Sequence, residues 1–113
     1  MAIAPLNEFK SLPYDVTTTP TIVYTTPIAI STIVLKIQVA NISNVSNNVS
    51  KITCSHVRNN KRTRIIFDGP VLANDFSVIS DGKLILQEGD SLEVSGSANN
   101  VLEMIINFLE TSA

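Results

Sequence analysis

The sequence has no tryptophan, one cysteine and one histidine, and these absences exclude several kinds of site. Because Cys54 has no second cysteine to pair with, no disulfide can form within the chain, which fits folding in a reducing cytoplasm. Because His56 is alone, neither a two-histidine metal site nor a hydrolytic triad with a second histidine can be built. Cys54 and His56 lie two residues apart on one side of a predicted strand, and we expect both to be structural.

Glycine and aromatic residues are also scarce. The 4 glycines are isolated, and none opens a strand-to-helix phosphate loop, so no nucleotide site is expected. Only 5% of the residues are aromatic, which leaves no platform for a carbohydrate, and no loop has the ligand spacing of a calcium site. We therefore expect no catalytic residue, no cofactor and no metal. A small-molecule hydrolase that depends on His56 is the enzymatic alternative.

Long apolar runs and a strong net charge are missing as well. The stretch from Ile28 to Ile42 is interrupted by polar residues and is too short to span a bilayer. The start, MAIAPLNEFK, lacks a basic segment followed by an apolar one, so we expect no signal peptide. The net charge of -2 gives no general attraction to nucleic acid or to an anionic membrane. We expect an intracellular product with no membrane contact.

What is present indicates one all-β domain. A chain of 113 residues, 44% hydrophobic and 16% charged, suffices for a single core. Short alternating runs bounded by turn residues predict strands at 21–25, 30–42, 49–57 and 63–67, with Ile33, Leu35, Ile37 and Val39 on one face of the second. Asp68-Gly69-Pro70 is expected to end the fourth strand. The pattern is typical of an antiparallel β-sandwich or jelly roll of about eight strands.

The stretch from Phe76 to Gly96 predicts an antiparallel meander. Its strands, at 76–79, 83–86 and 91–95, are separated by Asp81-Gly82 and Gly89-Asp90, which are strong turn signals. The last run, 101–109, fits either a strand or a helix. We favour a strand that covers an open sheet edge, because every preceding element is β.

Residues 1–20 are expected to form an extended arm, with the sandwich spanning 21–113. Three prolines, Pro5, Pro13 and Pro20, disfavour a continuous helix or a central strand. The apolar residues of the arm need cover, from the chain itself or from a neighbouring copy. Its candidate interface residues are Leu6, Phe9 and Tyr14.

A basic hairpin tip holds half of the positive charge. Of the 8 lysines and arginines, four lie within seven positions, and they leave the rest of the chain acidic. A solvated tip is the first interpretation. The functional alternatives are a contact with an acidic surface, either of another copy or of a partner, and, less favoured, a nucleic-acid site. The candidate residues are Arg58, Lys61, Arg62 and Arg64.

Several segments resemble small virion proteins of tailed bacteriophages, including those of marine and cyanobacterial phages. They are the opening MAIAPLNEF, TIVLKIQVAN, RNNKRTRIIFDGPVLANDF, DGKLILQEGDSLEVSG and the terminal IINFLE. The resemblance implies a β-sandwich subunit of a phage particle without enzymatic activity. That subunit would be a capsid decoration or a head, neck or tail accessory protein, assembled in the host cytoplasm.

The expected mechanism is therefore self-association and docking on other virion proteins, with a trimer among the possible homo-oligomers. The alternative is a tail-fibre or receptor- and glycan-binding adhesin module that presents the polar loops at 41–48 and 97–100. Nucleic acid is not an expected partner.

Overall fold

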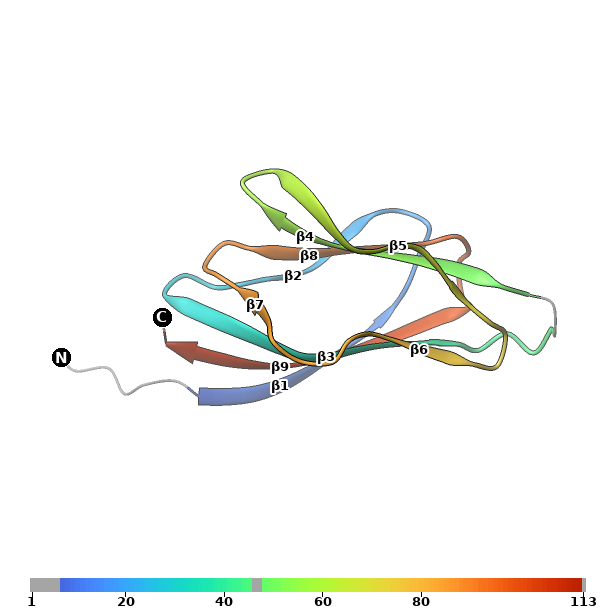
Figure 1. The fold of residues 1–113 in the computed structure, drawn as a ribbon, viewed down its shortest axis with the longest axis horizontal. Coiled ribbons are helices and arrows are strands. Elements are labelled where there is room, and N and C mark those ends of the chain that lie inside the picture. Colours follow the sequence, from blue (N-terminus) through green and yellow to red (C-terminus); the bar gives the residue numbers. More distant parts are fainter. Residues whose placement is uncertain (1–6, 46–47, 113) are drawn as a thin grey trace.

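The chain folds into two antiparallel sheets packed face to face (Figure 1). This computed structural model describes residues 7–45 and 48–112. The five-stranded sheet has the order β1-β9-β3-β6, with β7 also paired to β3, and the four-stranded sheet has the order β2-β8-β4-β5. The strands are β1 (Asn7–Asp15), β2 (Thr21–Thr25), β3 (Ile30–Asn41), β4 (Ser50–Arg58), β5 (Lys61–Val71), β6 (Phe76–Ser80), β7 (Leu84–Leu86), β8 (Ser91–Gly96) and β9 (Leu102–Ser112).

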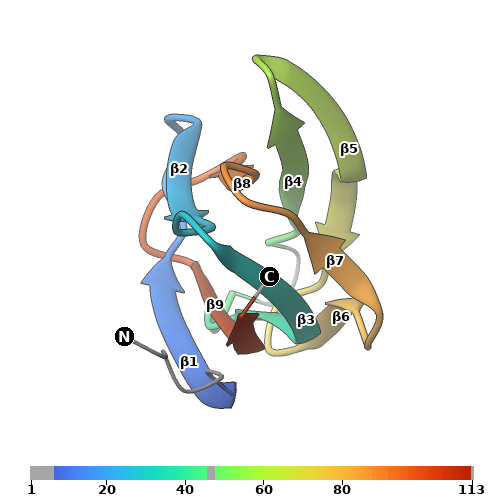
Figure 2. The same ribbon diagram turned by 90° about the vertical axis from the view of Figure 1, so that its left-hand side faces the viewer.

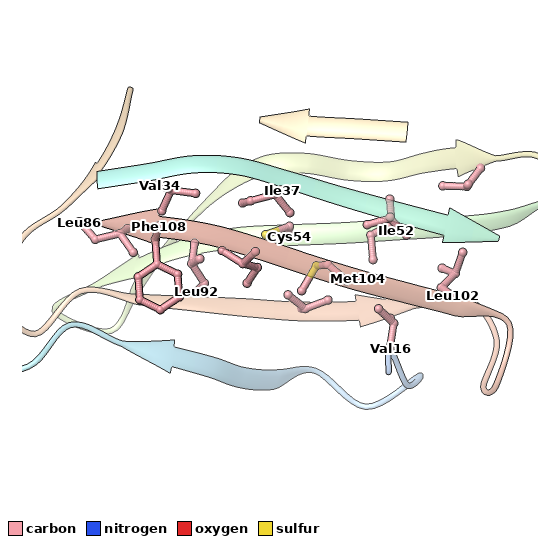
Figure 3. Close-up of a cluster of buried hydrophobic side chains, with 14 residues drawn as sticks. Val16, Val34, Ile37, Ile52, Cys54, Leu86, Leu92, Leu102, Met104 and Phe108 are labelled. Carbon is pink, nitrogen blue, oxygen red and sulfur yellow. The ribbon is translucent and has the colours of Figure 1, made fainter. Parts of the chain in front are cut away.

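The core fills the space between the two layers, which are seen edge-on in Figure 2. Alternate side chains of each strand point inward, because the pleat of a strand directs successive residues to opposite faces. Figure 3 shows these side chains meeting between the sheets, with the ring of Phe108 near one end and Leu102 near the other. The buried apolar residues are Val16, Val34, Ile37, Val39, Ile52, Cys54, Val71, Leu86, Leu92, Val94, Leu102, Met104, Ile106 and Phe108.

This architecture confirms the prediction of an all-β antiparallel sandwich, with nine strands in the described part of the chain instead of about eight. The final run is a strand, as expected. Its place was predicted wrongly, however: β9 lies between β1 and β3 in the middle of the sheet and does not cover an edge.

The additional strand is β1, which lies within the expected arm. β1 pairs along its length with β9, from Asn7 opposite Thr111 to Asp15 opposite Glu103. It sits at the edge of the sheet, where the missing amide hydrogen of Pro13 is tolerated because that side of the strand has no partner strand. Residues 7–15 thus belong to the sandwich, packed on their own chain, and residues 1–6 lie outside the described range.

The expected meander is not formed. β6 and β7 both pair antiparallel with β3, one after the other, so Asp81-Gly82 interrupts one side of a sheet instead of reversing the chain. β8 then crosses to the other sheet, where it pairs with β2 and β4. A positive φ, 116° at Gly82 and 63° at Lys83, serves a break in a strand as well as a hairpin turn. The sequence signal therefore located the turn correctly and gave the wrong pairing.

Two further predictions fail at irregular pairing. β5 continues through Asp68-Gly69-Pro70 to Val71, with register shifts against β4 and a φ of 49° at Asp68. In β3 the pairing with β9 shifts between Val34 and Lys36, so Leu35 is exposed while Val34 and Ile37 are both buried. An extra residue in one strand reverses the facing of all that follow, which simple alternation cannot foresee.

Candidate interaction surfaces

The two residues that the sequence offered for chemistry, Cys54 and His56, are both engaged in the structure. Cys54 and His56 both point to the inner side of β4, as predicted, but they have separate roles. Cys54 is fully buried in the core, and burial raises the pKa of its thiol to about 12, which keeps it protonated. His56 contacts the Asp90 carboxylate, with Nε2 3.0 Å from Oδ2. Neither side chain is free to hold a ligand.

Residues 7–45 and 48–112 hold neither a metal-binding cluster nor a helix that could cross a membrane. No group of three or more histidine, cysteine, aspartate or glutamate side chains is placed to hold a metal ion. Within the same ranges there is no helix with the length and apolar character needed to cross a membrane.

The buried carboxylate of Asp90 holds the base of the basic hairpin. Nε of Arg58 donates to Oδ1 at 2.8 Å and Nη2 donates to Oδ2 at 2.6 Å, while the backbone amide of Gln87 donates to Oδ2 at 2.8 Å. The Arg58 guanidinium is the main cause that holds the pKa of Asp90 well below its ordinary value, against the effect of burial, with help from His56 and Gln87. Backbone bonds from Thr26 complete the junction, because its amide donates to the Asp90 carbonyl and its carbonyl accepts from Gly89. The β7–β8 turn, the end of β2 and the end of β4 are thereby fixed to one another.

A second buried carboxylate, Glu110, links the two sheets at the same end of the sandwich as β7. The hydroxyl of Tyr24 in β2 donates to Glu110 Oε2 at 2.6 Å and lies 2.8 Å from Oγ1 of Thr32 in β3. Nζ of Lys10 in β1 lies 2.7 Å from Glu110 Oε1. Burial favours a raised pKa for Glu110, but the bonds from Lys10 and Tyr24 outweigh it, so the pKa is lowered. Burial and the bond to Glu110 raise the pKa of Tyr24 to about 12, so its hydroxyl remains a donor.

The basic hairpin forms as predicted, but its four charges are not equivalent. β4 and β5 are joined by Asn59-Asn60, and both asparagines have a positive φ, the backbone of a two-residue hairpin turn. Arg58 is bound to Asp90, and Arg62 donates from Nη2 to Glu93 Oε2 at 2.9 Å, so both are neutralised within the chain. Lys61 and Arg64 have no carboxylate within ion-pair distance among the described residues. The surface charge of the hairpin therefore comes from these two residues.

Arg64 also makes an aromatic contact. Its guanidinium carbon lies 5.5 Å from the centre of the Phe67 ring, and that ring is 65% exposed. Both residues belong to β5, the edge strand of the four-stranded sheet. Arg64 lies opposite Ser55, the residue between the inward-pointing Cys54 and His56, so the Arg64–Phe67 pair presents positive charge beside apolar surface on the outer side of the sandwich.

The outer face of the five-stranded sheet is apolar along one row. The row crosses four adjacent strands in register, from Phe9 in β1 to Leu109 in β9, Ile33 in β3 and Ile85 in β7. Phe9 is 74% exposed and Ile85 is 47% exposed. A contiguous exposed apolar row of this kind is typical of a surface that contacts another protein.

The opposite end of this face is acidic. Asp15 and Glu103 lie directly across from each other on β1 and β9, and no ion pair of either carboxylate is found in the described part of the chain. Beside them, Pro13 and Ile105 form the next outward pair, and Ile105 is 39% exposed. The four residues line a shallow depression of about 340 Å³. Like charges that face each other across two strands destabilise a sheet, and no ion pair with residues 7–45 or 48–112 relieves them.

The structure distributes the predicted interface residues unevenly. Phe9, Lys61 and Arg64 lie on the outside, and Tyr14 is half-buried against the core. Leu6 lies outside the described residues. The sequence interpretation missed Asp90, which was taken for a turn residue, and Glu110. The signal for Glu110 was available, since it follows Met104, Ile106 and Phe108 at the next inward position of the alternation.

No family model and no curated protein matches this sequence. A search of solved structures gives a match to Bacillus endospore appendages, described as a novel family of disulfide-linked pili. The match has a TM-score of 0.55 and 10% sequence identity, and it covers 96% of this chain and 88% of the other. The chain shares its fold with the protein of these pili.

This match corrects the resemblance to phage virion proteins. The structural neighbour is a pilus protein and not part of a phage particle, so the assignments as capsid decoration, head, neck or tail accessory protein, or tail-fibre or adhesin module are wrong. The predicted virion location and assembly in a host cytoplasm are wrong for the same reason. The physical reason is that a formula such as L-x-L-x-x-G-D-x-L-x-V-x-G encodes strands and turns, which many unrelated sandwiches share.

Proposed function

We propose that this chain is a non-enzymatic subunit that associates with copies of itself into a fibrous appendage outside the cell. The observation that carries the proposal is the fold match with pilus proteins over nearly the whole length of both chains. The outside of the sandwich supports it, because the features without a partner among residues 7–45 and 48–112 include an apolar row, an acidic pair and an exposed arginine on outer faces. The proposed interface residues are Phe9, Ile85 and Arg64. Arg58 and Arg62 are internal supports of the hairpin, Tyr14 is a packing residue of β1, and Lys61 is an exposed charge that points to the other side of β5 from Arg64.

The proposal is tested by the state of the purified chain. We expect sedimentation velocity to show species that grow with protein concentration, and negative-stain electron microscopy to show filaments of uniform width. A chain that stays monomeric at every concentration up to about 1 mM would reject the proposed function, because a weak specific contact has a dissociation constant at or below that range.

The apolar row provides the first variant. Replacing Phe9 and Ile85 together by serine should raise the concentration needed for assembly by about thirtyfold or more, because apolar anchors at an interface contribute about 1 kcal/mol or more each and about 2 kcal/mol corresponds to that factor. The matched control is Ile28→Ser. Ile28 is 82% exposed but lies in the loop between β2 and β3, off the row, so assembly should be unchanged. Equal effects of the two changes would show that general surface hydrophobicity, and not this row, drives assembly.

Such a fibre would differ from the disulfide-linked pili in its chemistry. Cys54, the one cysteine of these 113 residues, is fully buried with a protonated thiol, so it has no route to a disulfide with another copy. We expect fibres to persist in excess reductant, and Cys54→Ala to assemble as the wild type does. Thiol labelling should occur only in denaturant. Fibres that dissociate on reduction would contradict the non-covalent assembly.

A further inference from the structure

We propose that the acidic depression at Asp15 and Glu103 binds the Arg64–Phe67 pair of a second copy of this chain. This inference rests on the proposed function and names the contact by which copies join. The two surfaces are complementary in charge and in apolar character. One has two carboxylates beside Pro13 and Ile105, the other has a guanidinium over an exposed ring, and none of these charges forms an ion pair within the described ranges.

The two carboxylates of the acidic depression have no cation from residues 7–45 or 48–112 beside them on the outer face of the sheet. Asp15 and Glu103 are directly opposed across β1 and β9, and the residues next in line on the outer face are Ala40 in β3 and Phe76 in β6. Neither of those carries charge. Since no described residue supplies a cation here, a cation from a second copy would relieve the repulsion between the carboxylates, and an arginine can donate to two carboxylates at once through its planar fork.

The basic side is the one arginine of the hairpin that remains available. The guanidiniums of Arg58 and Arg62 are bound to Asp90 and Glu93, whereas that of Arg64 contacts the Phe67 ring and forms no ion pair with the residues that the structure describes. Stacking on that ring restricts Arg64 before binding, so less conformational freedom is lost when it meets a carboxylate. The exposed ring would in turn cover Pro13 and Ile105, as aromatic residues do at protein interfaces.

The placement of the two surfaces determines the form of the assembly. Arg64 lies on the outer face of the four-stranded sheet, and Asp15 and Glu103 lie on the outer face of the five-stranded sheet. In Figure 1, β1 lies in the lower layer and the β4–β5 hairpin in the upper layer. Each copy would thus bind one neighbour with each surface. A contact between two different surfaces continues as an open filament unless its rotation closes a ring.

The test exchanges the charges of the two surfaces and follows self-association of the full chain by sedimentation velocity. Arg64→Glu alone, and Asp15→Lys with Glu103→Lys, should each raise the concentration needed for assembly by about a hundredfold or more, because like charges then face each other. An equimolar mixture of the two variants should assemble again, since each supplies the surface that the other now requires. A single chain that carries all three substitutions should also assemble.

Lys61→Glu is the matched control. It changes the net charge as Arg64→Glu does and lies three residues away, but it points to the opposite side of β5, as the regular pairing of β5 with Val57, His56 and Ser55 shows. We expect it to change the assembly concentration by less than about threefold at about 0.15 M salt, where exposed charges are largely screened beyond about 8 Å. Circular dichroism and thermal melting should show that every variant is folded.

Three results would overturn the inference. If Lys61→Glu raises the assembly concentration as much as Arg64→Glu does, the effect of Arg64→Glu comes from overall charge and not from this contact. A mixture that fails to assemble would show that the two surfaces do not meet. If the wild type assembles and the Arg64→Glu variant assembles equally well, this contact is rejected and the proposed function stands. If the wild type never assembles, both are rejected.

Discussion

Replacing Asp90 by alanine is expected to lower the free energy of unfolding by about 3 kcal/mol, which corresponds to about 12 °C or more in Tm for a domain of this size. The side chain of Asp90 is 2% exposed and receives two bonds from Arg58, one from the Gln87 amide and a contact from His56. Its removal leaves the Gln87 amide and the His56 ring without their partner. Differential scanning calorimetry measures the loss.

Asp81→Ala is the matched control for this variant. Asp81 is an exposed aspartate in the loop between β6 and β7, and its loss should change stability by no more than about 0.5 kcal/mol. Asp90→Asn should fall between the two, because it retains the shape and one acceptor oxygen while losing the charge that Arg58 binds. If Asp90→Ala melts within a few degrees of Asp81→Ala, the carboxylate does not hold the hairpin.

The same carboxylate gives a defined dependence on pH. The pKa of Asp90 in the folded chain lies well below its ordinary value of 3.8. Its stabilisation is therefore complete above about pH 4 and is lost as pH falls toward the folded pKa, since the unfolded chain then binds a proton that the folded chain does not. The Tm difference between the wild type and Asp90→Ala should be largest near about pH 6 and should shrink between about pH 4 and about pH 2. A constant difference over that range would contradict the role of the charge.

The basic hairpin connects this stability to assembly. The Asp90 junction fixes the end of β4, and β4 leads through the Asn59-Asn60 turn into the strand that carries Arg64 and Phe67. A loosened junction leaves both residues in place chemically but lets the hairpin move relative to the rest of the sandwich. Binding then has to restrict that motion, which weakens the contact.

The strands could be predicted from the sequence because alternation depends on neighbouring residues. Leu102, Met104, Ile106 and Phe108 all point inward from β9, as the two-residue period requires. Their place in the middle of the sheet could not be predicted, because pairing depends on strands that are distant in sequence. Prolines concealed β1 for a related reason, since Pro13 excludes a central strand but is compatible with an edge.

The candidate surfaces could be predicted only in part. The density of positive charge at 58–64 identified the hairpin, but no local pattern indicated that Asp90 and Glu93 would neutralise two of its arginines. Asp15 and Glu103 are far apart along the chain, and the register of β1 against β9 brings them together. Surface chemistry of this kind arises from pairing, so it becomes visible only with the fold.

Replacing Glu110 by glutamine is expected to cost about 2–3 kcal/mol, because a buried charge that Lys10 and Tyr24 both bind becomes a neutral amide. The loss of stability should be largest in β1, because the Lys10–Glu110 ion pair connects β1 to β9 in addition to their backbone hydrogen bonds. Hydrogen exchange should therefore accelerate at the amides of β1 more than at those of β3. Glu8→Gln is the control, since Glu8 lies on the same side of β1 but is exposed.

A double-mutant cycle with Lys10→Met separates the ion pair from the rest of the Glu110 site. Lys10→Met alone leaves a buried carboxylate without its cation, so the pKa of Glu110 should rise and part of the stability at neutral pH should be lost. Combined with Glu110→Gln, it should cost less than the sum of the two single changes, because no uncompensated charge remains. Strict additivity would mean that Lys10 and Glu110 do not interact, and β1 would then be held by its backbone bonds and by Leu12 and Tyr14 alone.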